Sequence, residues 1–421
     1  MNTNDKARLE KAIYALSGLT LFRSLRADAL VKDVYSFLLY FSKTIEKSSP
    51  TLSERKKLID SYARLYAKLQ KKTNTHTPEL TAHIKNLLFL SDNPFSRAAA
   101  KRDSTKESLD SVLWKKAQTE MENLFSFLFL PSEIFTREIF EITGQTLPDW
   151  LIPASSETPE EALSHLFSFY QKNGFGLFSL YHAFVWKNKK LEPVRNPDTI
   201  KRSQLFSYEY QLSRIDENTQ KLVHGKIAEN LLLFGARGTG KSSSVKAMAN
   251  TYRKEGLRLI EINKDDLLTI SELLENISQY LDTRFSFILY LDDLSFAEND
   301  TRYTALKTLL EGGMKMRPKN TVIYATSNRR HIIVEKKEED MYASDSRNER
   351  LSLSDRFGIS IRFDTPIQTE YLDIVRGILS ERGVFFSPDT MEEEARAWAM
   401  QENGFSPRTA RQFCDAFESR S

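Results

Sequence analysis

The feature that most constrains the fold is a glycine-rich stretch that directly follows a short apolar run, Leu231–Phe234. The stretch matches the pattern G-x-x-x-x-G-K-S and consists of Gly235, Ala236, Arg237, Gly238, Thr239, Gly240, Lys241 and Ser242. Glycines at these positions let backbone N–H groups turn toward a phosphate where a β-carbon would collide. We therefore expect a strand, a phosphate-binding loop and a helix in succession, which is a unit of α/β folds.

The side chains at the end of this loop suit a nucleoside triphosphate and its metal ion. Lys241 is expected to reach the β- and γ-phosphates, and the hydroxyl of Ser242 to bind Mg²⁺, with Ser243 next to it. The alternative is a glycine-rich turn that matches by accident, which has a chance on the order of 1–2% at average glycine content. The sequence therefore predicts an ATP and Mg²⁺ site at this loop.

A second apolar run, Phe287–Leu291, ends in the two carboxylates Asp292 and Asp293. An acidic residue at the end of a buried strand is costly unless it meets water, a donor or a metal. We expect Asp292 to bind Mg²⁺ and Asp293 to face the γ-phosphate and orient the attacking water. The alternative for Asp293 is an N-cap of the following segment.

Apolar runs of strand length alternate with amphipathic helical stretches in the second half of the chain, which predicts a parallel sheet with crossover helices. The expected strands are Asn230–Phe234, Leu257–Ile262, Phe285–Leu291, Thr321–Thr326 and Ile359–Phe363. The first half shows helical spacing instead, and its stretch 92–104, rich in Ser and charge, predicts a loop. Two prolines within Leu191–Asp198 indicate a linker between the halves.

Composition narrows the class of protein. Lys and Arg total 60 and Asp and Glu total 57, a net charge of +3 that gives no reason to expect nucleic acid or a membrane surface as an obligate partner. Cys414 is the single cysteine, which excludes an intrachain disulfide and a cysteine zinc site. No apolar stretch approaches the roughly 20 residues of a membrane helix, and Met1–Leu16 lacks a signal-peptide core. We expect a soluble, cytoplasmic protein.

From about Gly176 onward the chain resembles a family of uncharacterised bacterial ATP-binding proteins of the AAA+ superfamily, known only as a domain of unknown function. The stretches that carry the resemblance are GARGTGKSSSVKAMAN (235–250), LRLIEINKDDL (257–267), FILYLDDLSF (287–296), LKTLLEGG (306–313), IYATSNRRH (323–331), LSLSDRFG (351–358) and SPRTARQF (406–413). Residues 1 to about 175 match no family.

The resemblance implies further site residues. Asn328 looks like the polar residue that senses the γ-phosphate, and its alternative is an ordinary strand-end asparagine. Arg356 looks like the arginine finger that reaches the nucleotide of a neighbouring subunit, a role that suits the fixed fork of guanidinium. A structural salt bridge is the alternative, since Arg329 and Arg330 also lie nearby in sequence. Arg408 looks like the arginine of the helical lid.

Two departures from the superfamily pattern stand out. Tyr208 belongs to a segment that resembles the lining of the adenine pocket, but Ser207 stands where a glycine is usual. Most AAA+ motors carry Asp-Glu at the second carboxylate strand, whereas this chain carries Asp292-Asp293. Replication initiators and helicase loaders also tend to carry Asp-Asp and act more as nucleotide switches. The alternative to Arg408 as the lid arginine is the fallback residue Arg411, which lies one turn later.

Together these features predict a helical N-terminal domain of unknown role (1–195), an AAA+ α/β core with a five-stranded parallel sheet (196–365) and a helical lid (366–421). A charged loop is expected between Val334 and Leu351. The expected function is a self-assembling Mg-ATP-dependent ATPase that remodels or loads an unidentified protein partner. The alternatives are a slow ATP switch or loader, with nucleic acid possible but unsupported, and a small-molecule kinase, which the finger and lid motifs disfavour.

Overall fold

A computed structural model of the chain describes residues 1–73, 80–150, 157–296, 300–311, 318–329, 356–402 and 404–419. The chain divides into two compact units, Met1–Leu180 and Tyr181–Ser421. This division differs from the expected boundary after residue 195. Residues 181–195 belong with the second unit because they add two strands to its sheet.

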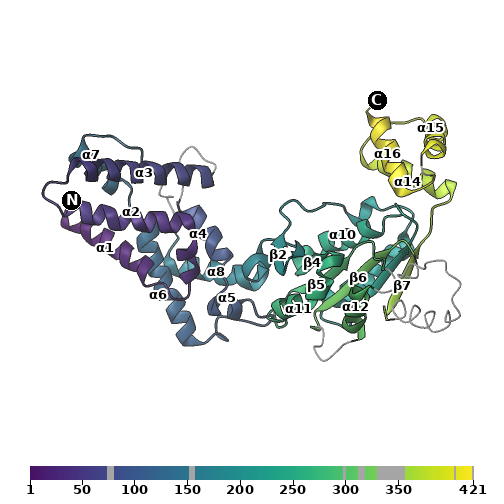
Figure 1. Cartoon of the computed structure of the whole chain (residues 1–421), viewed down its shortest axis with the longest axis horizontal. Coiled ribbons are helices and arrows are strands. Elements are labelled where there is room, and N and C mark those ends of the chain that lie inside the picture. The colour runs from purple at the N-terminus through teal and green to yellow at the C-terminus, as the bar shows by residue number, and fades with distance from the viewer. Residues whose placement is uncertain are drawn as a thin grey trace. The chain divides into compact units, whose positions relative to one another are not determined.

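In the described residues of the first unit, the regular elements are helices (Figure 1). They are α1 (Thr3–Ser17), η1 (Arg23–Ala27), α2 (Ala29–Ile45), α3 (Leu52–Thr73), α4 (Leu80–Phe89), α5 (Pro94–Ala99), α6 (Ser111–Leu128), α7 (Glu133–Thr143), α8 (Pro159–Asn173) and η2 (Gly176–Ser179). Aromatic side chains from α2, α3 and α7 pack edge to face, as Phe37 does with Tyr62 and Phe135. Such pairs stabilise beyond the area they bury.

The stretch 92–104, expected to be a loop, contains the short helix α5. Asn93 caps this helix by accepting a hydrogen bond from the Ser96 amide at 2.9 Å, and the Ser96 hydroxyl accepts one from the Asn93 amide. Pro94 occupies the first turn, where its missing N–H is not needed. The same Ser, Asn and Pro residues that signal a loop therefore also start a helix here.

The second unit is built on a seven-stranded sheet, not the five-stranded sheet that the sequence predicted. The strands are β1 (Ala183–Lys187), β2 (Lys190–Pro193), β3 (Leu231–Gly235), β4 (Leu257–Ile262), β5 (Ser286–Leu291), β6 (Thr321–Ser327) and β7 (Ile359–Phe363), in the order β2-β1-β4-β5-β6-β3-β7. All pairs are parallel except β1 with β2. Of the two extra strands, β2 overlaps the stretch Leu191–Asp198 in which the sequence suggested a linker, because proline is tolerated in a short edge strand. The other strand, β1, lies upstream of that stretch.

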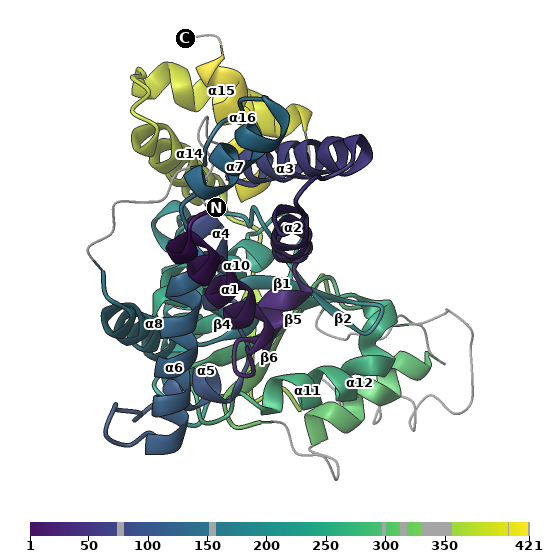
Figure 2. The same ribbon diagram turned by 90° about the vertical axis from the view of Figure 1, so that its left-hand side faces the viewer.

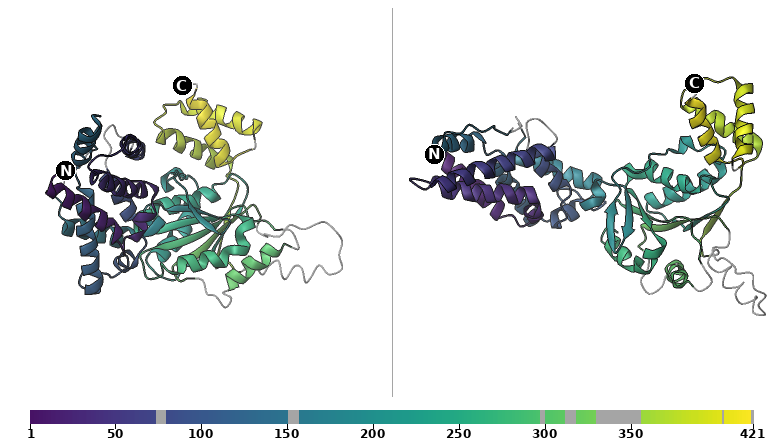
Figure 3. Two further views of the ribbon diagram at one scale, coloured as in Figure 1. Left: turned by 60° about the vertical axis from the view of Figure 1, so that its left-hand side comes forward. Right: turned by 45° about the horizontal axis from the view of Figure 1, so that its top comes forward.

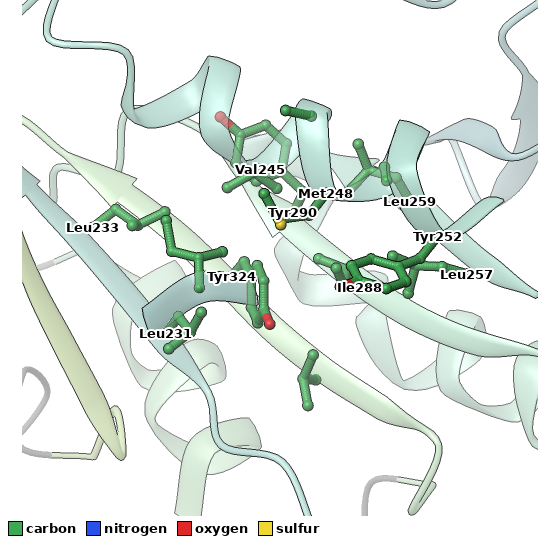
Figure 4. Packing of buried hydrophobic residues seen from close by; sticks show 14 of the residues in the cluster. Leu231, Leu233, Val245, Met248, Tyr252, Leu257, Leu259, Ile288, Tyr290 and Tyr324 are labelled. Carbon is green, nitrogen blue, oxygen red and sulfur yellow. The ribbon is translucent and has the colours of Figure 1, made fainter. Parts of the chain in front are cut away.

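Helices cover both faces of this sheet, with α10 on one side and α11 and α12 on the other (Figure 1 and Figure 2). The bounds are α9 (Glu209–Val223), α10 (Lys241–Tyr252), α11 (Ile270–Ser278) and α12 (Thr301–Glu311), with short helices η3 (Arg202–Gln204), η4 (Arg253–Glu255) and η5 (Lys264–Thr269). Figure 4 shows Leu231, Leu233 and Tyr324 of the sheet packed with Val245 and Met248 of α10. This core fixes the strands and α10 as one body.

The third part of the second unit is a group of helices, α14 (Gln368–Glu381), α15 (Pro388–Gln401) and α16 (Pro407–Glu418), seen in yellow in Figure 3. They share a small core around Tyr371, Val375 and Phe413, and Phe206 packs against it from the upstream chain. The charged loop expected between Val334 and Leu351 lies outside the described residues. Within the described part of the chain, no helix combines the length and apolarity that crossing a membrane requires.

Candidate functional site

The glycine-rich loop joins β3 to α10 as the sequence predicted, and its backbone needs glycine at identifiable points. Gly235 has φ +139, and a β-carbon there would lie 2.0 Å from the carbonyl oxygen of Phe363 on the neighbouring strand β7. Gly238 and Gly240 have φ +77 and +90, in the left-handed region that disfavours residues with a β-carbon. The loop therefore takes this form because glycine stands at these three positions.

Lys241, the first residue of α10, folds back over the loop. Its Nζ donates hydrogen bonds to the carbonyl oxygens of Gly235 at 2.9 Å and Ala236 at 2.6 Å, and lies 3.5 Å from Oδ1 of Asn328. The residue is only 6% exposed. Burial lowers the pKa of Lys241 from its usual value, while the carboxylates of Asp293 and Asp292 oppose that shift. An anion in the loop would favour the charged ammonium in the same way.

Asp292 accepts four hydrogen bonds on a single oxygen, Oδ1. The donors are the hydroxyls of Ser242 at 2.8 Å, Tyr290 at 2.6 Å and Thr326 at 2.6 Å, and the Asp293 amide at 3.1 Å. Burial alone would raise the pKa of Asp292, but the hydrogen bonds from Thr326, Tyr290 and Ser242 outweigh it and hold the pKa below its usual value. The carboxylate is therefore charged at neutral pH.

Asp293 has an unusual backbone, with φ +48 in the left-handed region. Its amide donates to the Thr326 hydroxyl at 2.9 Å, and its carboxylate accepts a hydrogen bond from the side-chain amide of Asn328 at 2.5 Å. The expected alternative role, an N-cap, would require a helix that starts at this point. The next α-helix, α12, begins at Thr301, and residues 297–299 between them lie outside the described chain.

A cavity of about 650 Å³ brings most of the predicted site residues together. Those that line it are Tyr208, Arg237, Gly238, Thr239, Gly240, Lys241, Ser242, Ser243, Asp292, Asp293, Asn328 and Arg408. Gly235 and Ala236 form the base of the loop and supply the carbonyls that hold Lys241. The fallback residue Arg411 also lines this cavity.

The lid helix α16 begins directly against the glycine-rich loop. The Arg408 amide donates to the carbonyl oxygen of Gly238 at 3.3 Å, and a β-carbon on Gly238 would lie 3.2 Å from Cβ of Arg408. Ser406 caps α16 by accepting a hydrogen bond from the Thr409 amide. This contact brings a lid cation to the same cavity as Lys241.

The predicted base-pocket segment, residues 206–208, lies between the sheet and the lid. The ring of Tyr208 packs against that of Phe363 in a tilted arrangement with centroids 5.2 Å apart, and its hydroxyl donates to the Asp364 carbonyl. Ser207, which replaces a usual glycine, has φ +65, so the backbone takes a glycine-like conformation despite the side chain. Its hydroxyl reaches the Glu370 carbonyl of α14 at 3.4 Å.

Arg356 lies elsewhere. It is half-buried and precedes β7 by three residues, at the amino end of that strand. The loop and both aspartates follow the carboxyl ends of β3 and β5. In a parallel sheet these carboxyl ends lie together, opposite the amino end of β7 where Arg356 lies. Arg356 is not among the residues that line the described cavity. Arg329 follows β6 and is exposed, and Arg330 lies outside the described residues.

Two residues that bind Asp292 were missed from the sequence, Tyr290 and Thr326. Both are buried, with exposures of 0% and 1%, and both hydroxyls bind Asp292. A signal was available, because side chains two apart in a strand point the same way. Tyr290 precedes Asp292 by two residues and Thr326 precedes Asn328 by two, so each polar strand-end residue is accompanied by a hydroxyl behind it.

The oxygens at this site fit a small, hard cation. The Ser242 hydroxyl and the Asp292 carboxylate lie 2.8 Å apart, and Mg²⁺ favours one or two such protein ligands, with water and phosphate oxygens completing its shell. Across the described ranges no group of three or more His, Cys, Asp or Glu side chains could hold a metal by itself. A magnesium ion carried by a phosphate is therefore the kind of metal these residues suit.

The family described as "Protein of unknown function (DUF815)" matches residues 179–421. The chain belongs to this family. The DUF815 match includes the whole second unit, Tyr181–Ser421, so the loop, both aspartates and the lid all lie inside it. The prediction of a family known only as a domain of unknown function is confirmed.

No curated protein matches this DUF815 chain. Among solved structures, the Thermotoga maritima RuvB Holliday junction branch migration motor is similar at 11% identity and a TM-score of 0.32, covering 52% of this chain and 72% of that chain. The RuvB T158V and A156S variants give 13% and 12% identity with TM-scores of 0.32 and 0.33 over the same shares. Similarity at this level supports no conclusion about function.

Proposed function

We propose that the chain binds Mg-ATP in the cavity between the glycine-rich loop and the lid and hydrolyses it as an AAA+-type ATPase. The observation that carries this function is the convergence of Lys241, the Ser242–Asp292 pair and the Asp293–Asn328 pair on one cavity. The strand order β4-β5-β6-β3-β7 supports it, because it places β6 with Asn328 between the strands that carry the loop and the aspartates.

Each side chain has a distinct role in this function. Lys241 exchanges its hydrogen bonds to Gly235 and Ala236 for β- and γ-phosphate oxygens, and Arg408 approaches the same phosphates from the lid. Ser242 and Asp292 would hold Mg²⁺, which supplies positive charge to the phosphate oxygens as the bond to the leaving group weakens. Asp293 orients the attacking water, and Asn328 holds Asp293 in place.

Two variants test this division of labour. Asp292→Asn should weaken nucleotide binding in the presence of Mg²⁺, because the metal loses a charged ligand. Asp293→Asn should leave Mg-ATP affinity within about threefold of the wild type and lower turnover by about 10²-fold or more, in line with the loss of a positioned general base. Calorimetry and phosphate release measure the two effects. Equal behaviour of the two variants would contradict the assignment.

The proposed ATPase assembles with copies of itself. Arg356 supports this because it lies at the amino end of β7, away from the residues that line its own cavity. A finger that serves a neighbouring subunit contributes about 10³–10⁵-fold to the rate. Arg356→Ala should therefore bind ATP normally and hydrolyse it poorly.

Mixing two inactive variants tests the assembly. Lys241→Ala subunits have a damaged pocket and an intact Arg356, and Arg356→Ala subunits have the reverse. Mixed oligomers, verified by light scattering, should regain activity that neither variant shows alone. Arg329→Ala is the matched control, since this exposed arginine should not be needed. Mixed oligomers without recovery would reduce Arg356 to a structural residue.

A slow ATP switch that loads or recruits a protein is the second candidate. It is favoured by Asp293, whose carboxylate is one methylene shorter than a glutamate and is already bonded to Asn328. Turnover well below about 1 per minute with tight binding would favour the switch, since typical enzymes turn over at about 1–10³ per second. We place either activity in the cytoplasm with an unidentified protein partner, and no described feature calls for nucleic acid.

A further inference from the structure

The hydroxyl of Thr326 joins the two aspartates of the site. It donates to Oδ1 of Asp292 at 2.6 Å and accepts from the amide of Asp293 at 2.9 Å. A threonine hydroxyl has one proton to donate, so the contact with the charged carboxylate fixes its direction. Its lone pairs then face the Asp293 amide, and a single side chain satisfies both neighbours.

The contact between the Thr326 hydroxyl and the Asp293 amide involves a residue with an unusual backbone conformation. A residue with a β-carbon at φ +48 is held in a conformation that costs roughly 1–2 kcal/mol relative to its ordinary one. The Asp293 amide is held by Thr326 Oγ1 and Asp292 Oδ1. These two acceptors stabilise the left-handed turn, and the turn brings the Asp293 carboxylate within reach of Asn328.

Tyr290 also holds Asp292. Its hydroxyl donates to the same Oδ1 at 2.6 Å, from a ring that is completely buried in the core between β5 and α10. The register pairs Tyr290 with Tyr324, two residues before Thr326, so the two hydroxyl donors come from adjacent strands. In the described part of the chain, every hydrogen bond recorded for this carboxylate falls on Oδ1, which leaves Oδ2 as the oxygen open to a metal.

We propose that Thr326 and Tyr290 are positioning residues that aim Asp292 at the metal ion, and that Thr326 also sets the backbone of Asp293. This inference rests on the proposed function, because it assumes that Asp292 binds Mg²⁺. Burying two hydroxyls at the end of an apolar strand face costs stability unless they find partners. An ordinary core would place Phe and Val here, so the hydroxyls serve the carboxylate.

The test compares nucleotide affinity with and without the metal. Thr326→Val keeps the shape of the side chain and removes the hydroxyl, and Thr326→Ser restores it. Thr326→Val should weaken ATP binding in Mg²⁺ by about tenfold or more, as the loss of a hydrogen bond to a charged group implies. Affinity in EDTA should stay within about twofold, and Thr326→Ser should return most of the affinity in Mg²⁺.

Tyrosine variants provide a second arm with a matched control. Tyr290→Phe should lower the Mg²⁺-dependent affinity in the same way, and it keeps the proposal testable if Thr326→Val does not fold. Tyr324→Phe removes a hydroxyl that is equally buried on the same sheet face but bonds to Asn218 and Thr219. That control should change the melting temperature without changing the dependence of affinity on Mg²⁺.

The possible outcomes distinguish failure of this inference from failure of the proposed function on which it rests. A wild-type protein that binds no nucleotide would overturn both. Normal wild-type binding, with Thr326→Val and Tyr290→Phe equally affected in Mg²⁺ and EDTA, would overturn only the positioning role. An effect of Tyr324→Phe as large as that of Tyr290→Phe would do the same, because it would trace the loss to general packing.

Discussion

One carboxylate in each unit accepts at least four hydrogen bonds, and the two differ in where the donors come from. Glu120 in the first unit is held by the amides of Thr20, Leu21 and Phe22 and by the Thr20 hydroxyl. Asp292 in the second unit is held by three side-chain hydroxyls and one amide. The direction of a backbone amide is fixed by the path of the chain, whereas the Ser242 hydroxyl can rotate toward a ligand.

This difference teaches that burial and hydrogen bonding of an acid do not by themselves mark a site. Glu120 is 5% exposed and caps the turn before η1, which is a structural task. Asp292 lines a cavity together with a lysine and three arginines. The cavity and the rotatable Ser242 hydroxyl, rather than the number of hydrogen bonds, mark the second unit as the one with the candidate site.

The largest expected effect is on stability, and it concerns Glu120, the structural carboxylate of the first unit. Glu120→Ala leaves three backbone amides without their acceptor, which should lower the free energy of unfolding of the first unit by about 3–5 kcal/mol. Nucleotide affinity of the second unit should be unchanged where the variant remains folded. Chemical denaturation measures the first quantity, and Glu122→Ala, an exposed glutamate on the same helix, is the control. A loss below about 1 kcal/mol would contradict the structural role.

A smaller effect is expected at the contact between the base-pocket segment and the lid. Gly377 of α14 has no side chain, and a β-carbon there would lie 2.6 Å from the ring of Phe206, which lines the cavity. Alanine normally favours a helix by about 1 kcal/mol over glycine. Gly377→Ala should instead destabilise the second unit by about 1–2 kcal/mol through overpacking and also weaken ATP binding.

Thermal melts and calorimetry measure the two consequences of Gly377→Ala. Ser380→Ala on the exposed side of the same helix is the control and should change neither. A variant that is more stable than the wild type and binds ATP equally well would show that Phe206 is free to move, and the pocket would then not depend on this contact.

The smallest expected effect is at Ser207, where φ +65 disfavours a β-carbon. Ser207→Gly should raise the stability of the second unit by about 0.5 kcal/mol, because relief of the left-handed strain exceeds the loss of a long hydrogen bond to Glu370. Ser207→Ala keeps the strain and loses the hydroxyl, so it should be less stable than the wild type. The order Gly, Ser, Ala in melting temperature checks this, and alanine as the most stable form would contradict it.

Local patterns in the sequence were enough to predict much of the second unit. The bounds of β4 and β7 agree with the predicted strands, because stretches of strand length that are rich in Ile, Leu or Phe and are followed by polar residues favour strands. The glycine-rich loop was predictable for the same reason, since its backbone depends on residue types at fixed spacing. These features depend on neighbours in the chain.

Features that depend on pairing between distant segments were missed. β1 and β2 are only five and four residues long, and β1 joins the sheet by pairing with β4, 76 residues later in the chain (Ala183 with Leu259). The roles of Tyr290 and Thr326 depend on the register between β5 and β6. The left-handed turn at Asp293 depends in turn on the Thr326 hydroxyl. These contacts join residues from different strands, so no single segment shows which residues will meet.

The most direct test of the central claim is a calorimetric titration of the full chain with ATP in Mg²⁺, carried out on the wild type and on Lys241→Ala. The wild type should bind ATP, and the variant should bind at least about 10²-fold more weakly, because it loses charge-assisted contacts to two phosphates. Lys6→Ala in the first unit is the control and should match the wild type. Absence of wild-type binding, or equal affinity for wild type and Lys241→Ala, would contradict the claim that the cavity at Lys241 is an ATP site.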